Sequence, residues 1–164
     1  MATIILISIL LISFFTDIKD RRILNIVTLP AIAFALIYHS VTGGFSGFQF
    51  SFFGFLVGLG LLFIPFAMGG MGAGDVKLLA AVGALQGPAF VFSAFLYTAM
   101  IGGLIAVLIL LKQGQLMDSI KRILFASRLR TLDIVDKKEL HHAFPYGVAI
   151  VLGTFIVQFG GWIQ

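Results

Sequence analysis

Six long apolar runs make up most of this sequence, and they limit its possible folds more than any other feature. The runs cover residues 2–15, 26–41, 50–68, 76–86, 89–111 and 144–163. Hydrophobic residues make up 60% of the 164 residues and charged residues only 11%, which is far from the balance of a water-soluble domain. We therefore expect an all-α, polytopic membrane protein with six transmembrane helices, forming one domain over residues 1–164.

The fourth and fifth runs are predicted to be separate helices. A single helix over residues 76–111 would be about 54 Å long at about 1.5 Å per residue, well beyond a hydrocarbon core of about 30 Å. Gly87 and Pro88 lie between the two runs and form a strong helix-breaking pair. The sequence therefore predicts a hairpin at this point.

The basic residues indicate the orientation of the helices. Positive charges follow the first run instead of preceding it, so we interpret this run as a retained helix and not as a cleaved signal peptide. If its N-terminus lies outside, all 11 Lys and Arg residues fall on one face of the membrane. By the positive-inside rule this face is cytoplasmic, and both chain termini are expected on the outer face.

The only long polar segment covers residues 113–142. Apolar residues recur in it at helical spacing with basic residues between them, a pattern typical of an amphipathic helix on an anionic membrane surface. The formal charge of +4 is therefore explained by topology, and we expect no nucleic-acid partner.

Cysteine is absent from the sequence, which excludes disulfides, cysteine ligands and cysteine nucleophiles. His39 is expected at the outer interface. His141 and His142 are adjacent and no third ligand is evident, so we expect no metal site. No cofactor is predicted.

Two acidic residues, Asp17 and Asp75, lie where an apolar run meets the predicted cytoplasmic interface. A carboxylate at that depth is costly to desolvate, which points to a function. Either one alone could instead be a helix-end residue, with Asp75 as an N-cap and Asp17 as a partner of Lys19 or Arg21. Two carboxylates that share a partly dehydrated site acquire different pKa values, so that one can act as a base and the other as an acid. Such a pair is suited to peptide hydrolysis of the aspartic type.

A glycine-rich turn over residues 69–74 precedes Asp75. Its glycines would allow an extended peptide to approach closely, although a flexible interfacial turn is an equally simple interpretation. Neither glycine pattern of phosphate-binding loops is present. Lys77 could anchor a phosphate headgroup or keep Asp75 ionised.

Three motifs together resemble the type IV prepilin peptidases, the GXGD class of membrane aspartic proteases. They are Asp17 followed by Arg-Arg-Ile-Leu-Asn at 21–25, Gly-Ala-Gly-Asp-Val-Lys-Leu-Leu from 72 to 79, and Pro-Tyr-Gly-Val-Ala at 145–149. The chain looks most like the short forms that serve tight-adherence (Flp-type) pili. The family often has Pro where this chain has Leu24. The larger members add a cytoplasmic domain with paired cysteines that methylates the new N-terminus, and because this sequence contains no cysteine we do not expect methylation.

The resemblance implies an aspartic endopeptidase of the inner membrane with Asp17 and Asp75 as its catalytic residues. It also implies cleavage at the cytoplasmic face and a prepilin substrate with a basic leader and an apolar helix. Pilus assembly proteins are possible further partners. The other motif positions, expected to bind substrate or shape the site, are Gly72, Gly74, Lys77, Asn25, Pro145, Tyr146 and Gly147.

Two functions of other classes remain as alternatives. One is a small carrier whose interfacial aspartates bind cations, although the middles of the runs offer few of the polar groups that a carrier uses. The other is a noncatalytic subunit of a pilus or secretion assembly.

Overall fold

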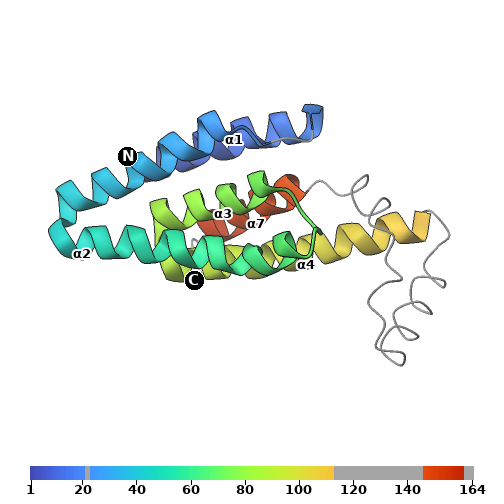
Figure 1. Cartoon of the computed structure of the whole chain (residues 1–164). Helices are drawn as coiled ribbons and strands as arrows, with labels where there is room; N and C mark the ends of the chain where they lie inside the picture. Colours follow the sequence, from blue (N-terminus) through green and yellow to red (C-terminus); the bar gives the residue numbers. More distant parts are fainter. Residues whose placement is uncertain (21–22, 113–145, 161–164) are drawn as a thin grey trace, which may run out of the picture.

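The computed structural model describes residues 1–20, 23–112 and 146–160, and this part of the chain is helical without any strand (Figure 1). The all-α prediction is confirmed there. The polar segment 113–142, Pro145, His141 and His142 lie outside the described residues. The helices are α1 (Ala2–Asp20), α2 (Asn25–Ala67), α3 (Ala73–Gln86), α4 (Pro88–Lys112) and α7 (Tyr146–Gly160).

Helix α2 contains the second and third apolar runs. Within its 43 residues only Gly44 has non-helical dihedral angles, with φ 58° and ψ −142°. A positive φ costs glycine little because it has no Cβ. In Figure 1, α2 folds back on itself at the left of the view. The uncharged link predicted over residues 42–49 is thus a sharp bend at Gly44.

The prediction of six transmembrane helices is wrong for the described chain. Three of its helices are long and apolar enough to cross a membrane, namely α1, α2 and residues 88–108 of α4. Two expected helices are joined in α2, while α3 has 14 residues and the described part of α7 has 15. The side of the membrane on which each terminus lies stays a prediction.

The predicted break between the fourth and fifth runs is confirmed. Helix α3 ends at Gln86, α4 begins at Pro88, and Gly87 between them has φ 87°. A Cβ at Gly87 would overlap the ring of Phe50. Both the backbone angle and the neighbouring ring therefore require glycine here.

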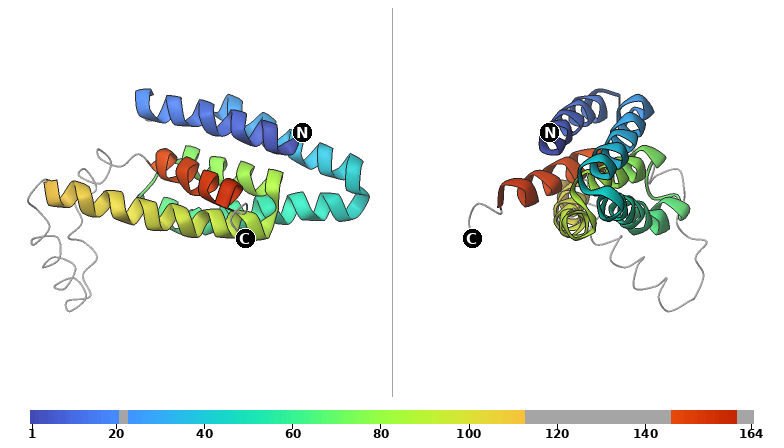
Figure 2. Two further views of the ribbon diagram at one scale, coloured as in Figure 1. Left: turned by 180° about the vertical axis from the view of Figure 1, so that it is seen from behind. Right: turned by 90° about the vertical axis from the view of Figure 1, so that its left-hand side faces the viewer.

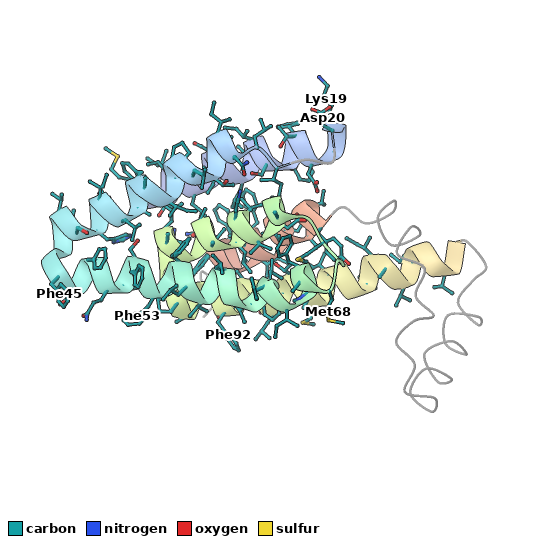
Figure 3. All side chains as sticks on the ribbon, in the orientation of Figure 1. Lys19, Asp20, Phe45, Phe53, Met68 and Phe92 are labelled. Carbon is teal, nitrogen blue, oxygen red and sulfur yellow. The ribbon has the colours of Figure 1, made fainter. Side chains whose placement is uncertain are left out.

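Helix α3 lies at the centre of the bundle. It packs against α1, α2, α4 and α7, and the side chains of Leu78, Leu79, Val82 and Leu85 are completely or almost completely buried. Figure 2 shows α7 lying between α1 and α4. The outer helices carry large exposed apolar side chains, among them Phe45, Phe53 and Phe92 in Figure 3. An apolar exterior around a packed interior is what a bilayer solvent allows.

The C-terminal end of α3 is buried, and α2 supplies donors for its carbonyl groups. The Ser51 hydroxyl donates to the Ala84 carbonyl at 2.8 Å, and His39 Nε2 lies 3.1 Å from the Leu85 carbonyl oxygen. The Gly87 N–H donates to Gly83. Because a carbonyl oxygen only accepts, Nε2 is the donor in the His39 contact. His39 thus holds the C-terminal end of a central helix, and its place at the outer interface stays a prediction.

Glycines allow α2 and α3 to approach very closely. A Cβ at Gly54 would overlap the Gly83 carbonyl group of α3, and a Cβ at Gly58 would collide with Leu79 and Ala80. Gly54 and Gly58 are one turn apart, so they lie on the same face of α2. Small residues at this spacing are typical of tight helix packing in membranes.

We predict that Gly54→Ala destabilises the protein and that Gly60→Ala does not. The first change forces apart two packed backbones, which costs about 1 to 3 kcal/mol. Among the described residues, nothing lies within 4 Å of a Cβ at Gly60 in the same helix, and alanine there raises helix propensity. Thermal unfolding of the two variants in detergent tests this. Equal midpoints would show that the α2–α3 contact does not limit stability.

Candidate active site

Asp17 is held inside the bundle by the geometry of α1. The buried face of this helix includes residues at helical spacing, namely Leu6, Leu10, Ser13 and Asp17. The helix continues through the charged residues to Asp20, so Asp17 lies within the helix and not beyond its end. Its side chain is only 6% exposed, and this degree of burial requires polar partners.

One partner of Asp17 comes from the far end of the chain. The Val148 backbone N–H in the first turn of α7 donates to Asp17 Oδ2 at 3.0 Å. First-turn N–H groups have no acceptor within their own helix, and the N-terminus of a helix favours negative charge. Helix α7 thus supplies both a donor and a favourable dipole to this carboxylate.

Gly147 makes this contact possible. A Cβ at position 147 would lie 2.6 Å from Asp17 Oδ2 and 2.7 Å from Asp17 Cγ. Such distances are well inside van der Waals contact. Any larger residue at 147 would therefore displace either the Asp17 carboxylate or the start of α7.

Asp75 lies in the first turn of α3. Its Oδ2 accepts a hydrogen bond at 3.2 Å from the backbone N–H of Gly72, the N-cap residue, and its own N–H donates to the Gly72 carbonyl at 3.2 Å. A carboxylate three residues after the N-cap commonly reaches back in this way. The helix-end role that the sequence left open for Asp75 is thus present, but Asp75 is not itself the N-cap.

The two carboxylates line one cavity of about 310 Å³. The other lining residues are Ile23, Leu24, Asn25, Gly72 and Gly74. The structure therefore brings Asp17, Asp75, Asn25, Gly72 and Gly74 together, and it places the two carboxylates at one cavity without substrate, which the sequence left open. Tyr146 and Gly147 lie beside them at the start of α7, and Lys77 reaches the cavity rim through Asn25.

Burial raises the pKa of Asp75 from 3.8 to about 6, with the negative charge of Asp17 as the second cause and the Gly72 hydrogen bond opposing both. Burial and the charge of Asp75 also raise the pKa of Tyr146. Two coupled carboxyl groups of this kind hold a single proton over a range of pH. A protonated and an ionised carboxyl can then polarise a carbonyl group and activate a water molecule.

Two glycines of the turn, Gly72 and Gly74, leave space for neighbouring groups of the protein itself. A Cβ at Gly74 would lie 2.9 Å from Ile23 Cβ and 3.2 Å from the Ile23 carbonyl oxygen. Gly74 therefore lets the turn pack against the segment between α1 and α2. A Cβ at Gly72 would lie 3.3 Å from Asp75 Oδ2, so a side chain there would crowd the carboxylate.

Lys77 makes a contact that the sequence did not predict. Its Nζ donates to Asn25 Oδ1 at 2.9 Å and so joins α3 to the first residue of α2. Ile23, Leu24 and Val148 were not predicted as site residues. Val148 contacts Asp17 through its backbone N–H, so its side chain gives no indication of this role in the sequence. The neighbouring Gly147 is the one local feature that points to it.

Within residues 1–20, 23–112 and 146–160, no group of three or more His, Asp or Glu residues could hold a metal ion. At the site, the described side chains that can take part in chemistry are the carboxyl groups of Asp17 and Asp75, the Tyr146 phenol, the Asn25 amide and the Lys77 ammonium group.

Comparison with known families gives one match. The family model described as the type IV leader peptidase family matches residues 4–107, a range that contains Asp17 and Asp75 and ends before α7. No curated protein and no solved structure matches the chain.

We predict that Asp17→Asn lowers the pKa of Asp75 from about 6 but leaves it above 3.8. The substitution removes the second cause of the shift, the charge of Asp17, while the first cause, burial, remains. Infrared titration of the carboxylic C=O stretch, with the Asp75 band assigned by its loss in Asp75→Asn, measures this value. An unchanged pKa would mean that the two groups do not interact.

Proposed function

The chain belongs to the type IV leader peptidase family, and we propose that Asp17 and Asp75 are its catalytic residues. The family match covers more than half of the chain and makes the protein a prepilin leader peptidase in general terms. The finer proposal is an aspartic-type endopeptidase of the inner membrane that cleaves Flp-like prepilins at the cytoplasmic face. The single observation that carries it is the shared cavity of Asp17 and Asp75.

The proposed reaction needs one proton on the carboxyl pair. The ionised carboxylate takes a proton from water while the water oxygen attacks the carbonyl carbon of the scissile peptide. The protonated carboxyl gives its proton to the carbonyl oxygen. When the intermediate collapses, the C–N bond breaks, the leaving nitrogen takes a proton from the pair, and one hydroxyl group of the intermediate gives its proton back to the pair. The products are a carboxylic acid and an amine, and the pair again holds one proton.

The electrostatics of the site support a division of roles within the pair. Asp75 is the group whose pKa is raised to about 6, so near that pH it carries the proton for about half of the time. Asp17 accepts a hydrogen bond from the Val148 N–H at the N-terminus of α7, an arrangement that stabilises a negative charge. We therefore assign Asp17 as the base and Asp75 as the acid of the first step.

The proposed substrate is a prepilin with a short basic leader and an apolar helix. Ile23 and Leu24 give one wall of the cavity an apolar character, and the exposed apolar side chains of α1, α2 and α4 are suited to a bilayer that also holds the substrate helix. Proteins of the pilus assembly machinery are proposed as further partners.

We predict that Asp17→Asn and Asp75→Asn each abolish leader cleavage while the protein still accumulates in the membrane. Asparagine keeps the shape of the side chain but cannot exchange the proton. Asp20→Asn is the matched control, because Asp20 is exposed at the end of the same helix as Asp17. Co-expression with a candidate prepilin, followed by mass spectrometry of the mature N-terminus, measures cleavage. Substantial cleavage by either active-site variant would contradict the assignment.

We predict that Gly147→Ala lowers kcat at least about tenfold, equivalent to about 1.4 kcal/mol of transition-state stabilisation, because the added methyl group displaces the Asp17 carboxylate. Gly160→Ala in the same helix is the control, since no described atom lies within 4 Å of a Cβ there. Kinetics with a purified prepilin in detergent separate kcat from KM. Equal kcat values for the two variants would show that Gly147 does not position Asp17.

A further inference from the structure

Asn25 is the first residue of α2, but its side chain does not cap that helix. The N-cap position is Leu24, and no side chain makes a capping hydrogen bond there. The Val27 and Thr28 N–H groups bond instead to the Leu24 carbonyl. Asparagine is favoured at helix starts because its side-chain oxygen accepts from free N–H groups. That reason does not apply to Asn25 in this structure.

The oxygen of Asn25 is used by Lys77. Lys77 Nζ lies 2.9 Å from Asn25 Oδ1, and an ammonium group only donates hydrogen bonds. The contact therefore fixes which end of the amide faces Lys77. The amide nitrogen, with its two N–H donors, is directed to the other side of the planar group.

Asn25 lines the cavity that contains Asp17 and Asp75. Its side chain is exposed, so a peptide in the cavity can reach it. An ionised carboxylate only accepts hydrogen bonds, so of the pair only the protonated Asp75 can donate to a peptide carbonyl oxygen. The Asn25 amide nitrogen can offer that oxygen a second donor.

We propose that Asn25 is a further catalytic residue, whose amide nitrogen donates a hydrogen bond to a carbonyl oxygen of the bound substrate peptide, and that Lys77 is the positioning residue that sets the direction of this amide. This inference rests on the proposed peptidase function. The hydrogen bond is strongest when negative charge develops on the carbonyl oxygen, so it lowers the barrier to water attack.

A purely structural role for Asn25 makes a different prediction, which Asn25→Asp distinguishes. Aspartate has nearly the same shape and keeps the contact with Lys77 as an ion pair, so the link between α2 and α3 survives. It has no N–H donor when ionised. If Asn25 only joins the two helices, Asn25→Asp will cleave substrate normally; if it donates to the substrate, the variant will fail.

The experiment measures prepilin cleavage by the purified full-length chain in detergent, with kcat and KM determined from pH 5 to pH 8. We expect Asn25→Asp to lose about 10² to 10³ in kcat at every pH, as for removal of one oxyanion donor, with an unchanged unfolding midpoint. The extra charge would by itself only raise the pKa values of the pair. A profile shifted to higher pH with a wild-type maximum would therefore overturn the proposal.

Lys77→Met provides the test of positioning. The substitution frees the Asn25 amide to rotate. In a chain that keeps Asn25 we therefore expect Lys77→Met to lower kcat about tenfold, and in an Asn25→Asp background we expect no further loss. Equal, independent losses in both backgrounds would show that Lys77 does not act through Asn25. Wild-type cleavage together with a fully active Asn25→Asp overturns this inference and leaves the proposed function intact. Failure of the wild-type chain to cleave any prepilin overturns both.

Discussion

The structure depends on burying the short helix α3 at the centre of an apolar bundle. A helix that ends inside such a bundle leaves carbonyl groups without water, and each unsatisfied group costs several kcal/mol, as a rough figure. Ser51 and His39 of α2 and the Gly87 N–H remove most of this cost at the C-terminal end. Gly54 and Gly58 allow α2 to come close enough for these contacts. With its C-terminal end fixed in this way, α3 presents its N-terminal turn, and Asp75 in it, to the cavity.

The other end of the bundle brings helix N-termini together around two carboxylates. Asn25 begins α2, Gly72 caps α3, and Val148 lies in the first turn of α7. Each helix start carries a partial positive charge and free N–H groups. This concentration of donors is what permits Asp17 and Asp75 to remain at a largely buried site.

The sequence was sufficient to predict the parts of this fold that follow from local chemistry. The apolar runs in the described residues are helical, and Gly87 and Pro88 separate two of the helices. Of the predicted site residues, Asp17, Asn25, Gly72, Gly74 and Asp75 line one cavity, although the sequence left open whether the two carboxylates are adjacent. In the part of the chain that the structure describes, three helices and not six are long and apolar enough to cross a membrane. Two predicted runs are joined in α2 with a bend at Gly44, and α3 and the described part of α7 are short. The contacts of His39 with Leu85 and of Lys77 with Asn25 join residues distant in sequence. Such contacts depend on helix packing, which no local pattern encodes.

The contact between Asp17 and α7 has a consequence for the biosynthesis of the protein. Both aspartates lie in the part of the chain that the ribosome makes early, and the family match ends at residue 107. The N–H of Val148 and the space left by Gly147 become available only after a much later segment has been translated. A nascent chain that has reached the end of α4 therefore holds both carboxylates, but Asp17 still lacks the hydrogen bond from Val148. The order of synthesis delays the completed site until α7 has been made and has packed against α1.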